Sequence, residues 1–128
     1  MRKLTPVLVL LTVLCLACNN ENKPIKKAAY DYCMATANYD IDGAEAFCTE
    51  ETRRTTLATA RYLLTMVDTA YITADTPATI KITDVLRTSD TTAVAVYHKV
   101  TPLKDFSDTL ELRLRDGRWL AHSPRLGR

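Results

Sequence analysis

The hydrophobic period of the chain changes once, at Asp75-Thr76-Pro77, and this change restricts the possible folds more than any other feature. Before it, apolar residues recur every three or four positions, as in amphipathic helices. After it, they alternate with polar residues, as in strands that bury one face. We therefore expect an α+β fold, in which N-terminal helices pack on a curved four-stranded antiparallel sheet. The 128 residues suffice for one domain.

Three helices are predicted before this change. The first covers 24–37, because Pro24 suits a first helical turn and small apolar residues recur at helical spacing. A helix of about two turns follows, with Asp42 as its N-cap and Glu45 as the capping-box partner. Thr49 then begins a long helix. The apolar stripe of this long helix consists of Leu57, Ala60, Leu64, Val67 and Tyr71.

Four strands are predicted after the change. Two cover 78–87 and 92–100, and a polar loop over 101–108 leads to a third strand. The apolar residues of that strand are Leu110, Leu112 and Leu114. Asp116-Gly117 is typical of a two-residue hairpin turn, so a fourth strand should follow it. This turn places His122 beside Glu111, on the outer face of the sheet.

The register of the first hairpin decides which of its residues face the core. A two- or four-residue loop would mix polar and apolar residues on each face. A three-residue loop instead aligns apolar residues on one face: Ile80, Ile82, Leu86, Val94, Val96 and Val100. The same register puts Asp84 opposite Val96 and His98 opposite Ile82, so Asp84 and His98 become polar neighbours on the inner face. They could form a pocket that exchanges protons with a ligand; the alternative is that they lie at the sheet rim in water.

The N-terminus combines a basic start, an apolar run and a small residue before a cysteine. Arg2 and Lys3 precede an apolar run from Leu4, and Ala17 stands directly before Cys18. This pattern resembles the signal of bacterial lipoproteins, which implies cleavage before Cys18 and a lipid on its sulfur. The run is too short to suit a helix that spans a bilayer. The alternatives are an ordinary cleaved signal and an uncleaved anchor.

The expected organisation is a signal over 1–17, a lipidated tether over 18–23, one α+β domain over 24–123 and a tail over 124–128. Without the two basic residues of the signal, fifteen basic and fifteen acidic side chains remain. Nucleic-acid partners need a surface of one sign, so this balance argues against them. We therefore expect a protein of the bacterial cell envelope, on its periplasmic or surface face, held to the membrane by the lipid on Cys18.

Two cysteines remain once Cys15 is lost with the signal and Cys18 carries lipid. A Cys33–Cys48 disulfide would suit an oxidising compartment and would close a loop of about 15 residues. The alternative is two buried free thiols. A redox-active pair is disfavoured because catalytic pairs usually stand as C-x-x-C at a helix start.

Three short motifs, taken in order, carry a resemblance to a known superfamily. They are A-Y-D-Y over 29–32, Y-D-I-D-G-A over 39–44 and D-G-R-W over 116–119. With the expected order of elements, residues 24–123 resemble the small lipoprotein domains of the nuclear-transport-factor-2-like (cystatin-like) superfamily. The resemblance implies a sheet that curls around the long helix into a cone, whose open end can hold a small molecule. Cystatin-type inhibition is not expected, because no Q-x-V-x-G segment is present.

Two classes of function remain. One is a non-catalytic, lipid-anchored module that binds a small ligand or an envelope protein. The other is an enzyme that uses Asp84 and His98 inside the cone. An enzyme requires an enclosed cavity around these two groups, whereas a partner-binding module would expose an apolar patch, with Leu120 as a candidate member. We expect no metal, because His98 and His122 are too few ligands, and no cofactor, because no nucleotide-binding motif is present.

Overall fold

The computed structural model describes residues 22–125. A first helix covers 22–37, and the elements after it are α2 (Ile41–Ala44), the 3-10 turn η1 (Glu45–Phe47), α3 (Glu50–Thr52), the π-helical η2 (Arg53–Leu57), α4 (Ala58–Leu64), α5 (Thr69–Ala74), β1 (Thr79–Arg87), β2 (Thr92–Val100), β3 (Asp105–Arg115) and β4 (Arg118–Ala121). The four strands form one antiparallel sheet in the order β1-β2-β3-β4. The expected α+β order is confirmed.

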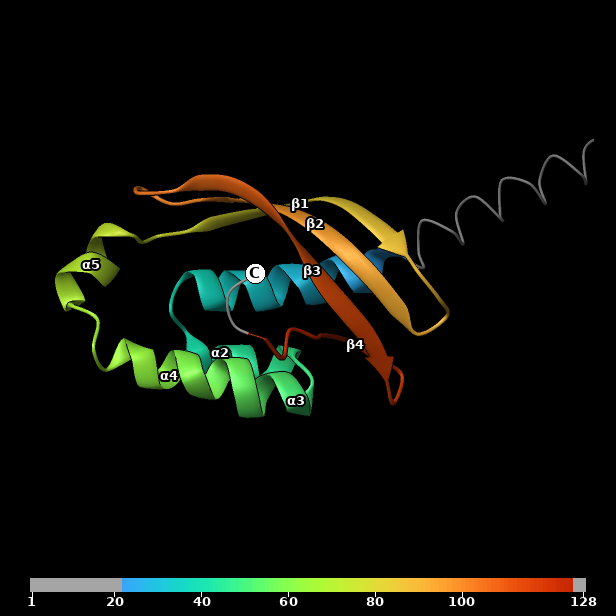
Figure 1. Cartoon of the computed structure of the whole chain (residues 1–128). Helices are drawn as coiled ribbons and strands as arrows, with labels where there is room; N and C mark the ends of the chain where they lie inside the picture. Colours follow the sequence, from blue (N-terminus) through green and yellow to red (C-terminus); the bar gives the residue numbers. More distant parts are fainter. Residues whose placement is uncertain (1–21, 126–128) are drawn as a thin grey trace, which may run out of the picture.

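The first helix lies between the sheet and the helical run α3–η2–α4 (Figure 1). Because it is the middle layer, it buries residues toward both neighbours rather than along one stripe. Its buried side chains are Ile25, Ala29, Tyr32, Cys33 and Ala37. In Figure 1 its start lies at one end of the molecule, while the connection from α4 to α5 lies at the other.

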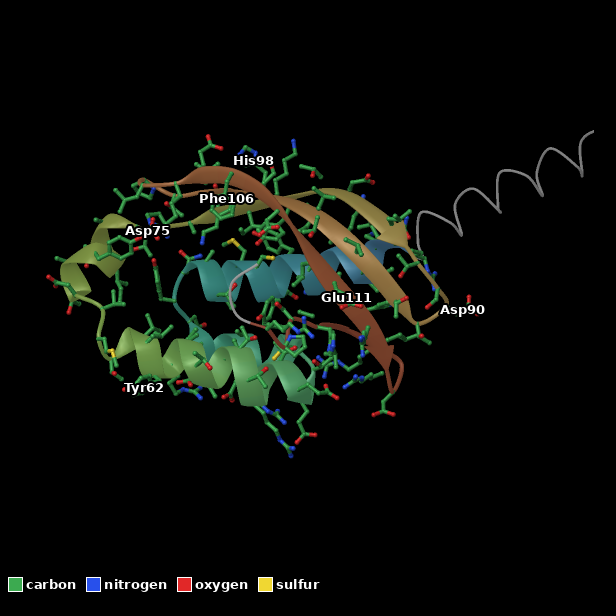
Figure 2. The ribbon with its side chains drawn as sticks, in the orientation of Figure 1. Tyr62, Asp75, Asp90, His98, Phe106 and Glu111 are labelled. Carbon is green, nitrogen blue, oxygen red and sulfur yellow. The ribbon has the colours of Figure 1, made fainter. Side chains whose placement is uncertain are left out.

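The first hairpin has the predicted loop, and Ile80 and Ile82 face the core as predicted. Between the bulge and the loop, and along β2, the opposite face is turned to the core. Thr88 N–H donates to the Thr92 carbonyl at 3.0 Å, which closes a three-residue loop, and Asp84 pairs with Val96 as expected. A register shift between Ile82 and Asp84 then pairs Lys81, rather than Ile82, with His98. The residues predicted to face inward near the loop therefore face outward; Leu86 is 64% exposed, and Figure 2 shows His98 on the side of the sheet away from the helices.

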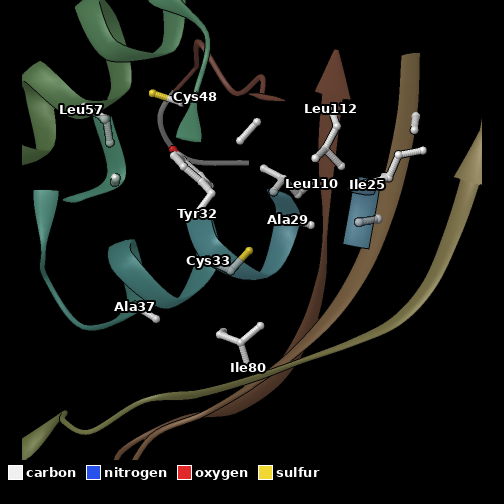
Figure 3. Packing of buried hydrophobic residues seen from close by; sticks show 14 of the residues in the cluster. Ile25, Ala29, Tyr32, Cys33, Ala37, Cys48, Leu57, Ile80, Leu110 and Leu112 are labelled. Carbon is white, nitrogen blue, oxygen red and sulfur yellow. The ribbon is translucent and has the colours of Figure 1, made fainter. Parts of the chain in front are cut away.

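Small side chains explain this reversal. The inner face of β2 carries Ala93 and Ala95, both fully buried, followed by Tyr97. Alanines allow the first helix to approach the sheet closely, and Figure 3 shows its Ala29 and Cys33 among the core residues. Both faces of β2 are apolar, so the alternation pattern could not decide between them.

The second hairpin matches its prediction. Leu112 pairs with Ala121 and Leu114 with Trp119. The turn residues have positive φ, 52° at Asp116 and 76° at Gly117, as a two-residue hairpin turn requires. However, β3 begins at Asp105, so the predicted polar loop over 101–108 shortens to a tight turn.

Two helix boundaries also differ from the prediction. The N-cap of α2 is Asp40, whose side chain accepts from the Gly43 N–H at 3.0 Å, so Asp42 lies within the helix. Thr49 does cap α3, but the long helix ends at Leu64. Asp68 starts the separate helix α5 because its side chain accepts from the Ala70 N–H at 2.9 Å.

The assignment of sheet faces can be tested with two leucines. Leu112 is fully buried and Leu86 is 64% exposed. Leu112→Ala should lower the free energy of unfolding in urea by about 3 kcal/mol, whereas Leu86→Ala should change it by less than about 0.5 kcal/mol. If both variants lower the free energy of unfolding equally, Leu86 is buried, as the alternation pattern predicted.

Candidate functional site

An open groove lies where the connection after the first helix, α2 and the end of α4 meet. Its volume is about 310 Å³, and its lining consists of Tyr39, Asp40, Ile41, Asp42, Arg61, Leu64 and Thr65. Apolar and charged side chains share this lining. The groove opens widely to solvent, so it suits the edge of a macromolecular contact better than a closed reaction chamber.

The charged side chains of the groove bind one another. Arg61 Nη2 lies 2.6 Å from Asp42 Oδ1 and 2.8 Å from Glu45 Oε1, and these two carboxylates raise the pKa of Arg61. Asp40 is held by its capping bond to α2. The groove lining thus carries two carboxylates and one guanidinium, and Glu45 beside it also pairs with Arg61, which leaves the groove acidic.

Next to the groove, the end of α4 exposes large apolar side chains. These residues are Tyr62 (61% exposed), Leu63 (42%), Met66 (63%) and Val67 (37%), and we call them the α4 apolar surface. Met66 and Val67 follow the end of α4, where the Thr65 and Met66 N–H groups donate to the Tyr62 and Leu63 carbonyls at 3.1 and 3.0 Å in a tight turn. Figure 2 shows Tyr62 pointing away from the core. Apolar side chains gathered in this way mark interaction sites in soluble domains.

A buried carboxylate fixes Tyr39, which lines the groove. Asp75 is fully buried and accepts hydrogen bonds from Thr101 Oγ1 at 2.5 Å and Tyr39 Oη at 2.6 Å, while Lys104 Nζ lies 3.0 Å away. The bonds from Thr101, Tyr39 and Lys104 lower the pKa of Asp75 to about 2, although burial opposes them. Lys104 also lies over the ring of Tyr71, 5.4 Å from its centroid. No local sequence pattern predicted this cluster, because its members come from three separate segments of the chain.

Asp84 and His98 do not line an interior pocket, so that prediction is wrong. They share the outer face of the sheet, where Asp84 is exposed and accepts from the backbone N–H of Val85 at 2.9 Å. His98 Nε2 instead contacts Asp105 Oδ1 at 2.5 Å, with the imidazole 39% exposed. The bulge in β1 explains the position of Asp84, because it breaks the alternation after Ile82 and moves Asp84 to the opposite face from Ile80 and Ile82. His98 lies on the outer face because β2 turns Ala93 and Ala95 to the core.

The predicted Cys33–Cys48 bridge is not formed: both residues are buried free thiols. Cys33 faces the sheet, near Lys99 and Asp108, whereas Cys48 lies beside α3 and forms a backbone bridge with Ala121. Figure 3 shows Tyr32 between the two sulfurs. Burial raises the pKa of both thiols, that of Cys33 to about 12, so neither is a reactive thiolate at neutral pH.

His122 was predicted on the outer face, yet it is buried with 8% exposure. Its Nδ1 lies 2.9 Å from Thr49 Oγ1, because the chain turns under α3 after β4. Leu120, the candidate patch member, is half-buried. Among the described residues, no three side chains of His, Cys, Asp or Glu converge on a possible metal site.

The predicted signal and its acceptor Cys18 lie outside the described residues. Between residues 22 and 125, no helix has both the length and the apolar character needed to cross a bilayer. The anchor therefore stays a prediction from the sequence.

The role of Asp75 can be tested by substitution. Asp75→Asn leaves the Lys104 ammonium without its charged partner, so we expect the free energy of unfolding at pH 7 to fall by about 3 kcal/mol. The folded-state pKa of about 2 lies below the ordinary 3.8, so the ionised carboxylate stabilises the fold above about pH 4. This contribution is lost as pH falls through about 2.

Urea unfolding of both proteins between pH 7 and pH 2 checks this account. The difference between them should shrink below about pH 4. Asp90→Asn, at an exposed loop position, is the matched control and should change little. A difference that stays constant down to pH 2 would contradict the assigned charge state of Asp75.

Comparison of the chain with family models, curated proteins and solved structures finds no match in any of the three. The resemblance to the nuclear-transport-factor-2-like superfamily therefore rests on the sequence motifs, and the α+β architecture with its open antiparallel sheet is what the structure adds.

Proposed function

We propose that the chain is a non-catalytic, lipid-anchored protein of the bacterial envelope that binds another protein through the α4 apolar surface and the adjoining groove. The observation that carries this proposal is the exposure of four large apolar side chains at the end of α4 and in the turn that follows it. The core is complete without them, because α4 already turns Leu64 inward and the preceding turn buries Leu57. Exposed apolar area without a core role favours a docking function.

The first helix separates the proposed anchor from the proposed docking surface. Its 16 described residues span about 24 Å, and Cys18 can lie at most about 14 Å from residue 22. Figure 1 shows residue 22 and the α4–α5 connection at opposite ends of the molecule. A lipid on Cys18 would hold the first end near the membrane and leave the α4 apolar surface to face outward.

The charge distribution favours the same orientation. Lys23, Lys26 and Lys27 are exposed near the start of the first helix. Asp68, in the α4–α5 connection, is exposed at the other end. Anionic headgroups attract basic side chains and repel acidic ones, so the α4 apolar surface suits a protein partner better than a lipid surface. The partner should carry basic side chains around an apolar contact, to match the acidic groove.

The geometry favours no second function. A cone enzyme would need Asp84 and His98 enclosed together, and both face solvent from the outer side of the sheet. The groove holds neither histidine nor cysteine, and its carboxylates are occupied by Arg61 and by the α2 cap. Binding is therefore the proposed activity.

The anchor is tested by replacing its acceptor. Cys18→Ser should release the protein from membranes into the soluble fraction, because it removes the sulfur that would carry the lipid. Cys15→Ser, in the same apolar run, is the matched control and should stay with the membranes. Retention of Cys18→Ser in the membrane fraction would refute lipidation at this residue.

The docking surface is tested by substitutions at two positions whose apolar side chains have similar size and exposure. Met66 is 63% exposed on the α4 apolar surface, and Leu86 is 64% exposed on the outer face of the sheet. A photo-crosslinking residue at Tyr62 should give one discrete protein adduct in cells. Met66→Lys should abolish that adduct, whereas Leu86→Lys should leave it unchanged, with both variants as stable as the parent.

Two results would contradict the proposal. One is the absence of any adduct from Tyr62 in intact cells. The other is an adduct that Leu86→Lys removes as effectively as Met66→Lys, which would assign docking to the sheet instead.

A further inference from the structure

Hydrogen bonds hold the segment after β4 against α3 and η2. The Thr49 N–H donates to the Ala121 carbonyl at 2.9 Å, and the Ser123 N–H donates to Thr52 Oγ1 at 2.9 Å. Thr56 Oγ1 donates to the Ser123 carbonyl. Because Thr49 and Thr52 are 1% and 0% exposed, water cannot replace these partners without an opening of the structure.

Two threonine hydroxyls connect this segment to a buried imidazole. Thr52 Oγ1 lies 2.8 Å from Thr49 Oγ1, which lies 2.9 Å from Nδ1 of His122. Thr52 Oγ1 already accepts from the Ser123 N–H, so its own proton can point to Thr49. The Thr49 proton then points to Nδ1. Every group in this row is satisfied when Nδ1 is an unprotonated acceptor.

We propose that Thr49, Thr52, His122 and Ser123 form an acid-sensitive latch, which is closed while His122 is neutral and opens when Nδ1 takes a proton. A protonated Nδ1 can only donate, so it meets the hydroxyl proton of Thr49. That proton must turn back toward Thr52, whose own proton then loses its acceptor. The Ser123 N–H can still donate to Thr52 Oγ1, but the unsatisfied Thr52 proton and the buried charge of the imidazolium destabilise the closed form. Residues 121–125 then detach from α3 and η2, while the sheet and the first helix keep their contacts. The latch is independent of the proposed partner binding.

The charges that face His122 do not stabilise an imidazolium. Arg113, Arg115 and Glu111 come from β3, and Glu51 comes from α3. Arg115 pairs with Glu51 at 2.6 Å and Arg113 lies 3.7 Å from Glu111, so the two acids are largely neutralised. Burial therefore dominates and lowers the pKa of His122 below its ordinary 6.5.

The direction of the pH dependence follows from this lowered pKa. The open segment binds a proton more readily than the closed one, so the closed latch is most stable above about pH 6.5. Its stability falls as pH drops below that value, by at most about tenfold per pH unit, until the lowered pKa is passed.

Amide hydrogen exchange with NMR detection tests the latch in the purified full-length protein. Between pH 7.5 and pH 5, the protection factor of the Ser123 amide should fall severalfold, while Ala93 and Ala95 in β2 keep their protection. The nitrogen shifts of the His122 ring should show an unprotonated Nδ1 at pH 7.5. Unchanged protection of Ser123, or a protonated Nδ1 in the neutral ring, would overturn the proposal.

Two variants test whether the His122 imidazole is the group that responds to acid. His122→Asn offers an uncharged acceptor near the position of Nδ1, so Ser123 should keep its protection at pH 5. His98→Gln removes the other histidine, on the outer face, and should open like the parent. If His122→Asn loses as much Ser123 protection at pH 5 as the parent, the imidazole does not control the latch. If Ser123, Ala93 and Ala95 lose protection together in the parent, the acid effect is general unfolding rather than a latch.

Discussion

The buried carboxylate of Asp75 is the interaction on which the arrangement of helices and sheet depends. Its partners Tyr39, Thr101 and Lys104 come from the loop after the first helix and from the turn between β2 and β3. Asp75 itself ends α5, directly before the change from helices to strands. A buried charge needs such partners, because without them its desolvation would oppose folding. The same bonds hold Tyr39 at the groove, so the fold and the proposed binding surface share one support.

The position of the first helix as the middle layer explains several other features. Consecutive residues of a helix point in different directions, so Tyr32 and Cys33 reach different layers. This separation leaves the two cysteines as isolated thiols. The helix also sets the long axis of the molecule, with basic residues near its start and the acidic groove after its end.

Local signals predicted the order of elements and the hairpin at Asp116-Gly117, where positive φ demands particular residues. Thr49 was also predictable as a cap. The buried face of β2 was not, because Ala93 and Val94 are both apolar and only packing against the first helix separates them. The Asp75 cluster escaped prediction because its partners are distant in sequence. His122 was misplaced because strand alternation was extended one residue beyond Ala121, where β4 ends.

We propose that a lipid on Cys18 holds one end of the molecule while the α4 apolar surface binds a protein at the other. Native mass spectrometry of the full-length protein, extracted from its own membranes in mild detergent, tests both parts together. The account predicts a mature chain that begins at Cys18, carries acyl groups, shows no mass deficit from a disulfide and retains one protein partner. An unprocessed chain without lipid, or a lipidated chain that carries only a small molecule, would contradict it.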